Sequence, residues 1–171
     1  MTDEFRRGAT SGRTRVLNEE VVVTSKSFTR AGVLARSPIA ARLPAQDLAR
    51  ARRFYAEKLG LDPVEEREGG LRYECGGVAF ALFSSAGAPS GAHTQMGWEV
   101  DDIDATVAEL RTRGVVFEEY DFPGLTTVDG IADIEGNYPS KGVGERAVWF
   151  HDSEGNLLGI GQPVRATGTA N

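Results

Sequence analysis

The sequence predicts an α+β protein made of two successive βαβββ modules. A strand, an aspartate, an amphipathic helix and a glycine follow one another over residues 43–60, and the same order recurs over residues 98–114. After the first of these units, two Gly-Gly pairs separate short apolar runs, as in a meander of hairpins. Residues 145–162 place two apolar arms around a turn-rich centre, which is typical of a closing β-hairpin.

Residues 1–37 are predicted to be an irregular N-terminal extension, because they mix Arg, Ser, Thr and Gly without a sustained helical or strand period. The predicted organisation is this extension over residues 1–37, a first module over 38–84, a linker over 85–92, a second module over 93–164 and a tail over 165–171. The linker is predicted from its small residues, which favour a flexible chain.

The first module begins with a short strand at Ile39. Asp47 is a good helix N-cap and Gly60 a good helix terminator, so a helix is expected between them. Four apolar residues share one face of this helix: Leu48, Ala51, Tyr55 and Leu59. That face should pack on a sheet. Three strands are predicted to build the sheet after the helix, over residues 63–68, 71–75 and 78–83.

The second module repeats the pattern. A strand is predicted over residues 95–100, and Asp101-Asp102 should cap a helix that ends at Gly114. Further strands are predicted over residues 115–118 and, within the Gly- and Pro-interrupted segment 120–144, over residues 126–134. In the closing hairpin, period-two alternation places Ala147, Trp149 and His151 on one face and Val148 and Phe150 on the other. We expect one face to join the core and the other to be concave and open.

Composition narrows the function classes. The net charge is −6, and residues 38–171 carry −9 because they hold 12 of the 19 basic and 21 of the 25 acidic residues. An acidic body disfavours a nucleic-acid partner. No apolar run is long enough to cross a membrane and no secretory leader begins the chain, so we expect a cytoplasmic protein. The single cysteine, Cys75, excludes a disulfide framework within the chain.

Three segments resemble signatures of the vicinal oxygen chelate superfamily, which includes glyoxalase I, extradiol dioxygenases and bleomycin-resistance proteins. They are ARLPAQDLARARRFYAEKLGL, MGWEVDDIDATVAELRTRGV and the closing F-x-D-S-E-G-N turn with its following apolar pair, and together they cover residues 39–163. The resemblance implies a glyoxalase-like fold, in which the meanders of the two modules curve into a half-barrel with the helices outside. It also implies a homodimer.

Metalloenzymes of this superfamily hold a divalent ion with side chains from four strands. Matched motif to motif, the four ligand positions fall on Ala40, a residue within 78–83, Gln95 and Gly159. Only Gln95 has a side chain that could contact a metal, and one neutral amide is a poor ligand. We therefore expect neither the family's metal nor another cofactor.

The only two histidines, His93 and His151, lie near the third ligand position and at the end of the closing hairpin's first arm. A different metal site or an acid–base pair at these residues stays open as an alternative. No carboxylate stands at a ligand spacing beside either one, which favours solvated histidines at the rim of the sheet.

Six residues are the predicted ligand-binding set: Arg42, Gln95, Glu99, Tyr138, Trp149 and His151. Trp149 is expected to be a wall on which a flat ring or a cation stacks. Gln95 and Glu99 would orient polar or cationic groups and Arg42 an anionic group. The segment that carries Tyr120, Phe122 and Tyr138 is expected to form a lid, and Trp98, one residue out of phase, should pack under the helices.

The resemblance and the missing ligands together predict a small-molecule-binding protein like the bleomycin-resistance proteins, which give antibiotic resistance by sequestering a drug. The ligand would be a flat or cationic natural product. The alternative is a divergent glyoxalase-, epimerase- or dioxygenase-like enzyme, with a displaced divalent metal or with Glu99 or His151 as a base. A third possibility is a regulatory or partner-binding module that uses the basic extension, residues 1–37.

Overall fold

A computed structural model describes residues 37, 39–136 and 142–165. The chain divides into two compact units, Met1–Pro38 and Ile39–Asn171, and all but one of the described residues belong to the second. The predictions for residues 1–36, for Tyr138 and for residues 166–171 lie outside the described residues.

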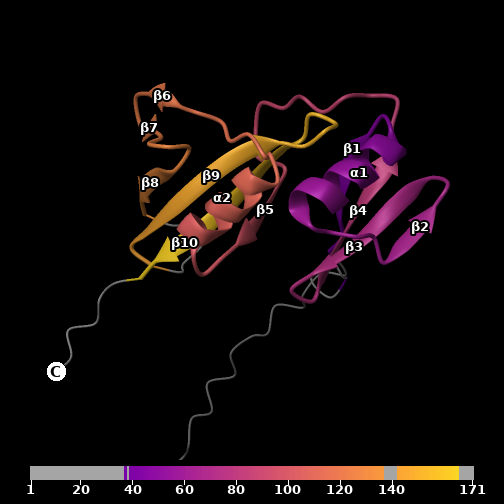
Figure 1. Cartoon of the computed structure of the whole chain (residues 1–171), viewed down its shortest axis with the longest axis horizontal. Coiled ribbons are helices and arrows are strands. Elements are labelled where there is room, and N and C mark those ends of the chain that lie inside the picture. The colour runs from indigo at the N-terminus through magenta and orange to yellow at the C-terminus, as the bar shows by residue number, and fades with distance from the viewer. Residues whose placement is uncertain (1–36, 38, 137–141, 166–171) are drawn as a thin grey trace, which may run out of the picture. The chain divides into compact units, whose positions relative to one another are not determined.

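The first βαβββ module is present in the predicted order (Figure 1). Its elements are β1 (Ala41–Ala45), α1 (Leu48–Leu59), β2 (Glu65–Arg67), β3 (Gly70–Cys75) and β4 (Val78–Ser84). The strands form one sheet in the order β1-β4-β3-β2, in which β1 runs parallel to β4 and the other pairs are antiparallel. Helix α1 connects β1 to β2, the two edge strands of this sheet, and the chain then returns through β3 to place β4 beside β1.

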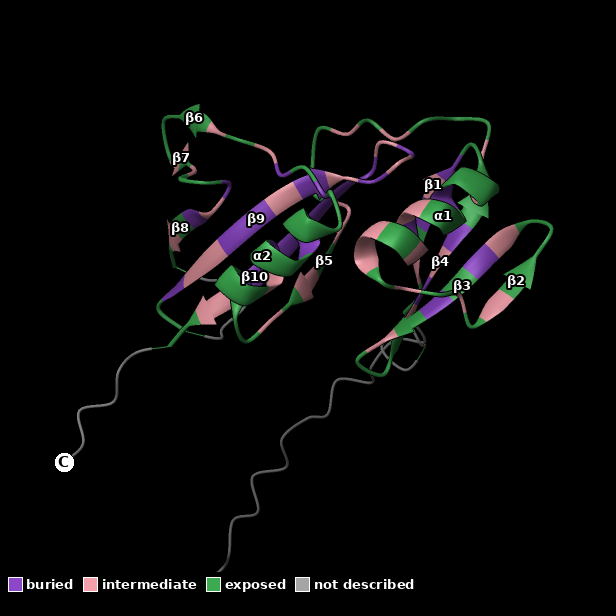
Figure 2. Ribbon diagram, in the orientation of Figure 1, coloured by how far each residue is buried: buried purple, intermediate pink, exposed green. Residues whose placement is uncertain are grey.

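Helix α1 begins and ends as its sequence predicts. The side chain of Asp47 accepts a hydrogen bond from the Arg50 backbone N–H at 2.9 Å, and Gly60 ends the helix with a φ of 68°, a conformation that favours glycine. Ala51 and Tyr55 are completely buried, and the opposite face of the helix is exposed (Figure 2). The predicted apolar stripe is the side that packs on the sheet.

The second module has the same topology. Its main elements are β5 (Met96–Glu99), α2 (Ile103–Thr112), β8 (Ala132–Glu135), β9 (Gly144–His151) and β10 (Leu157–Val164). Its sheet has the order β5-β10-β9-β8, so β5, β10, β9 and β8 correspond to β1, β4, β3 and β2. A small hairpin of β6 (Asp121–Phe122) and β7 (Leu125–Thr126) lies outside that sheet. This repeat confirms the predicted α+β fold of two βαβββ modules. Among the described residues, the modules form two open sheets and no closed barrel.

Two strand predictions in this module were wrong. Residues 115–118 contain only an isolated bridge between Phe117 and Phe150, with a hydrogen bond from Glu118 N–H to Trp149 O at 2.7 Å. The strand predicted over residues 126–134 is interrupted by a tight turn at Asp129 and Gly130, whose φ values are 50° and 73°. Positive φ at two successive residues cannot continue a strand.

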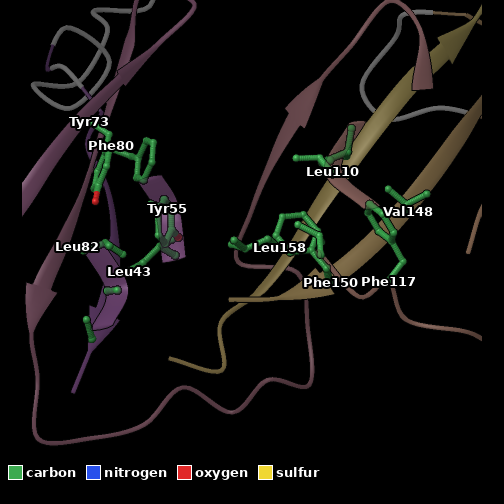
Figure 3. Close-up of a cluster of buried hydrophobic side chains, with 14 of the residues drawn as sticks. Leu43, Tyr55, Tyr73, Phe80, Leu82, Leu110, Phe117, Val148, Phe150 and Leu158 are labelled. Carbon is green, nitrogen blue, oxygen red and sulfur yellow. The ribbon is translucent and has the colours of Figure 1, made fainter. Parts of the chain in front are cut away.

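The core lies on the helix-facing side of the sheets. Figure 3 labels ten members of this core, which come from both modules: Leu43, Tyr55, Tyr73, Phe80, Leu82, Leu110, Phe117, Val148, Phe150 and Leu158. Trp98 packs against this core as predicted, with its ring stacked on Phe150 at a centroid distance of 6.4 Å and edge-on to Phe80 at 6.3 Å. Among the described residues, no helix is long and apolar enough to span a bilayer.

The turn between β9 and β10 fastens the second module to the first through Glu154. Its side chain is completely buried and accepts hydrogen bonds from the backbone N–H groups of Gln46 and Asp47, at 2.8 and 3.0 Å. Arg50 donates two more, from Nε and Nη2, at 2.8 and 3.0 Å. A carboxylate at the amino end of α1, paired with a bidentate guanidinium, is a strong arrangement.

Asp152 and Asn156 complete this junction. Asp152 accepts a hydrogen bond from the buried Tyr55 hydroxyl at 3.1 Å, and its other oxygen accepts from the backbone N–H groups of Glu154 and Asn156. Asn156 Nδ2 donates to Pro44 O at 3.0 Å and to Asp152 Oδ2 at 2.8 Å. The D-S-E-G-N turn therefore has a structural role, because it connects β1 and α1 of the first module to the closing hairpin of the second.

Candidate ligand-binding site

The concave face of the second module's sheet carries a cavity of about 820 Å³. Its lining comes from β5, β8, β9 and β10, together with the residues that precede β5. Val148 and Phe150 point the other way and are completely buried in the core. Ala147 and Trp149, on the other face of the predicted alternation, line the cavity; Val148 is also among its lining residues, so the division between core and cavity is not complete.

Three glycines in neighbouring strands form the floor of this cavity. Gly159 is paired with Gly97 in β5 and with Trp149 in β9, and Gly161 is two residues further along β10. A Cβ atom at Gly159 would lie 3.3 Å from the Thr94 methyl carbon and 3.5 Å from Trp149 Cδ1. A methyl group at position 159 would contact the indole, and a longer side chain would have to displace the indole from the glycine floor.

Trp149 is also part of an aromatic cluster. The ring of Tyr120 meets it edge-on at a centroid distance of 5.5 Å, and Phe122 meets Tyr120 at 5.6 Å. Phe122 is 52% exposed, although it is a large apolar residue. Burial, followed by the charge of Glu118, raises the pKa of the Tyr120 hydroxyl above its ordinary value. The β6–β7 hairpin thus places two aromatic rings next to the wall of the cavity.

Polar groups stand on the same face. Gln95 lines the cavity, and its Oε1 atom is buried without a hydrogen-bond partner in the described part of the chain. Glu99 and Glu145 lie in strands on either side of β10 and both line the cavity. Partial burial and then the charge of Glu99 raise the pKa of Glu145. The cavity therefore has an aromatic wall, an unused amide acceptor and two carboxylates.

Three of the six predicted ligand-binding residues line this cavity: Gln95, Glu99 and Trp149. Arg42 lies on β1 in the first module and does not line it, and Tyr138 is outside the described residues. Glu145 also lines the cavity and was not among the predicted residues, although the alternation of Ala147 and Trp149 reaches it two residues earlier.

His151 does not line the cavity either. Its Nδ1 atom is 2.8 Å from Glu118 Oε1, and its Nε2 atom is 3.2 Å from Gly91 O. Partial burial lowers the pKa of His151, but the hydrogen bonds with Glu118 and Gly91 outweigh this effect and the net shift is upward. His93 has a separate partner, Ser90, at 3.3 Å. His151 therefore connects the linker to the end of the segment that carries Tyr120.

We expect the His151 imidazolium to titrate above about pH 6.5, the ordinary value for histidine. Because the folded-state pKa is raised, this residue's contribution to stability is complete below the unfolded-state value and is lost as the pH rises through the folded-state value. An NMR titration of the His151 ring protons measures the midpoint. In the Glu118→Gln variant the midpoint should fall, and an unchanged midpoint would show that the Glu118 contact does not control the charge.

Few donor atoms stand at the positions that the sequence resemblance matches to the family's metal ligands. Ala40 and Gly159 offer no donor atom, and the indole of Trp149 occupies the space beside Gly159. In β4 the residues that alternate with buried Phe80 and Leu82 are Ala79, Ala81 and Phe83, which are apolar. Over residues 39–136 and 142–165, no group of three or more His, Cys, Asp or Glu side chains is placed to hold a metal ion.

A protein-family comparison identifies the family. Residues 37–159 match the model of the Glyoxalase/Bleomycin resistance protein/Dioxygenase superfamily. The chain belongs to this superfamily. The match confirms the resemblance that the three sequence signatures carried, and it includes the strands β5 and β9 and the floor residues Gly97 and Gly159.

Solved structures of superfamily members share the fold. A glyoxalase/bleomycin resistance protein/dioxygenase from Alicyclobacillus acidocaldarius matches with 16% identity and a TM-score of 0.56, over 75% of this chain and 92% of its own. An antibiotic binding protein from Streptomyces sp. CB03234 has 24% identity and a TM-score of 0.51, over 75% and 98%. A fosfomycin resistance protein from Listeria monocytogenes has 10% identity and a TM-score of 0.52, over 75% and 93%. A sequence comparison with curated proteins gives no match.

Proposed function

We propose that this superfamily member binds a flat organic molecule on the concave face of its second module and sequesters it without chemical change. The observation that carries the proposal is the cavity of about 820 Å³ with a glycine floor and the Trp149 indole as one wall. A volume of this size suits a drug-sized molecule. The fold also occurs in an antibiotic binding protein and in a fosfomycin resistance protein, which supports the proposal.

Binding without the family's metal is part of the proposal. Its support is the set of side chains at the four ligand positions, of which only Gln95 carries a donor atom. Without a Lewis acid at that place, an enolate or a bound dioxygen would lack the stabilisation that the superfamily's metal supplies. The ligand would instead be held by ring stacking on Trp149 and by hydrogen bonds, with Gln95 Oε1 as an acceptor for a ligand donor.

Replacing Trp149 by alanine should weaken the binding of a planar aromatic antibiotic by about 1 to 3 kcal/mol, because a stacked ring loses its platform. A screen of such compounds by quenching of tryptophan fluorescence would select the probe, and calorimetry would measure both affinities. Phe83→Ala is the control, since Phe83 is a partly exposed aromatic residue of the first module that does not line the cavity. An affinity unchanged by Trp149→Ala would contradict stacking.

The enzyme alternative makes a different prediction about metal content. A divergent enzyme with a displaced ion should carry near-stoichiometric iron, manganese, nickel or zinc when it is purified without a tag or chelator. It should also lose activity with chelator and regain it with one of these ions. Plasma mass spectrometry measures the content directly, and a stoichiometric metal would overturn the metal-free proposal.

We further propose that the protein works as a cytoplasmic homodimer. The charged and apolar concave faces of the two sheets are open surfaces that a second copy could cover, and the lone Cys75 is a free thiol, as is common in reducing compartments. The basic extension, residues 1–37, is a candidate for the dimer contact. Light scattering on the full chain and on a chain without residues 1–37 would test this role, and a monomeric full chain would refute the dimer.

A further inference from the structure

Glu145 is the charged residue that lies deepest over the floor of the cavity. It stands on β9, four residues before Trp149 and on the same face of the strand. A Cβ atom at Gly161 would overlap the Glu145 Oε1 atom, so the carboxylate lies directly on that glycine. Gly161 is paired with Ala147, two residues closer to Trp149, and the Glu145 side chain therefore leans along the sheet toward the indole.

Nothing in the described part of the chain neutralises this carboxylate, because no hydrogen bond or ion pair holds it there. The nearest arginine in sequence, Arg146, points to the opposite face and binds Asp104 and Asp133. On the cavity side, Glu99 is paired with Gly161 from the neighbouring strand β5. Two carboxylates thus flank one floor residue, and the one that has no partner among the described residues, Glu145, disfavours an additional negative charge.

The carboxylate and the indole are separated by a short distance. Gly161 is paired with Ala147, and Gly159 is paired with Trp149. The two pairs are two residues apart along the strands, a separation of about 7 Å. A molecule with a flat ring and a positive group one short alkyl spacer apart can reach both. Gln95, whose buried Oε1 lacks a partner, lies on the same face beyond Gly159 and can accept a hydrogen bond from the ring's substituents.

We propose that the ligand carries a protonated amine, which the Glu145 carboxylate receives, and a flat ring, which stacks on Trp149. This inference rests on the proposed function and names the ligand class of the same cavity. A charge-assisted hydrogen bond in a partly buried place is the strongest single contact that this face offers. An anionic ring compound would meet the Glu145 carboxylate and be repelled.

The same geometry links binding to pH. Burial and then Glu99 raise the pKa of Glu145, so the carboxylate gains a proton more easily than an exposed glutamate. An ammonium group binds only the ionised form. Amine affinity should therefore be greatest above the raised pKa and should fall as the pH falls through it, and the Glu145 proton is released when the amine binds at that pH.

The test compares 2-(1-naphthyl)ethylamine with 2-(1-naphthyl)ethanol, which differ only in the amine and the hydroxyl. Their dissociation constants would be measured from the backbone amide shifts of Gly159 and Gly161 in NMR titrations, at several pH values from about 8 to about 4.5. We expect the amine to bind about tenfold more tightly at the upper pH, the preference that one charge-assisted hydrogen bond supplies. The preference should shrink toward the lower pH.

Two variants isolate the carboxylate. Glu145→Gln should remove both the preference for the amine and its pH dependence while leaving the alcohol affinity unchanged. Gly161→Ala keeps the charge but moves the carboxylate off the floor, so the preference should fall there as well; Gly161 has no positive φ that would forbid alanine. Glu57→Gln, an exposed residue of α1 with the same change in charge, should leave the preference intact.

The outcomes separate this inference from the proposed function. Equal affinity for amine and alcohol, or a preference that survives Glu145→Gln, would overturn the amine assignment while a Trp149-dependent alcohol affinity still supported the binding function. Absence of shifts at Gly159 and Gly161 with either probe would overturn both.

Discussion

Replacing Glu154 by glutamine should lower the free energy of unfolding by about 2 to 4 kcal/mol, the cost of removing one partner from a buried ion pair. The Glu154 side chain is completely buried and accepts from five donors: the backbone N–H groups of Gln46 and Asp47, two N–H groups of Arg50 and the Ser153 hydroxyl. An amide keeps one acceptor oxygen but points its NH₂ group at a donor. Urea unfolding followed by circular dichroism measures the loss.

The matched control is Glu66→Gln, which makes the same chemical change in the exposed ion pair between Glu66 and Arg52. Such pairs contribute about 0.2 to 1 kcal/mol, so this variant should remain close to the wild type. Equal losses in the two variants would show that the buried turn does not fasten the modules together.

The charge of Glu154 also predicts a dependence on pH. Burial raises the pKa of this carboxyl, but hydrogen bonds from Arg50 and then from the Asp47 N–H, Ser153 and the Gln46 N–H outweigh it, and the net shift is downward. Its stabilising contribution is therefore present above the unfolded-state pKa of about 4.3 and is lost as the pH falls through the folded-state value. The difference in stability between the wild type and Glu154→Gln should narrow in that range.

Introducing glutamate at position 159 should weaken the affinity for planar aromatic probes about tenfold or more. It should not create a metal site. The new Cβ would lie 3.3 to 3.6 Å from Thr94 and Trp149, and the longer side chain must displace the indole from its glycine floor. Even with that carboxylate, Ala40 and the apolar residues of β4 provide no other ligands. Calorimetry with the probe and metal analysis of the variant measure the two effects.

Gly159→Ala is the control, because a lone methyl group at those distances is close to ordinary van der Waals contact. It should retain most of the affinity. Tight binding of a divalent ion by Gly159→Glu would contradict the argument that the remaining ligand positions cannot support a metal.

Local signals in the sequence were sufficient for most of the fold. Asp47 and Asp102 cap the two helices as expected, with N–H···O distances of 2.9 and 3.0 Å to residues three positions on. The glycine pairs and the alternation in the closing hairpin located the strands β3, β4, β9 and β10. The segment between α2 and β9 was less predictable. The bridge at Phe117 depends on pairing with the distant strand β9, and the turn at Asp129 depends on an uncommon positive φ.

The candidate site was predictable on one face only. Alternation places Gln95, Glu99 and Trp149 on the cavity side, because side chains on a strand point to opposite faces in turn. Alternation cannot show which sheet carries the cavity. Arg42, which was predicted for the same site, lies on β1 of the other sheet and does not line the cavity. Glu145 was overlooked because an acidic residue at a strand start resembles surface charge until Gly161 is seen beneath it.

By itself the sequence determined the repeated βαβββ order, the helix ends and the core-facing residues, because these follow from local propensity, period and residue identity. Tertiary structure alone decided that Glu154 is a buried ion between the modules, that Trp149 fills the space beside Gly159 and that Glu145 lies over the cavity floor. Those facts depend on contacts between residues far apart in the chain, whose burial and partners no local pattern specifies.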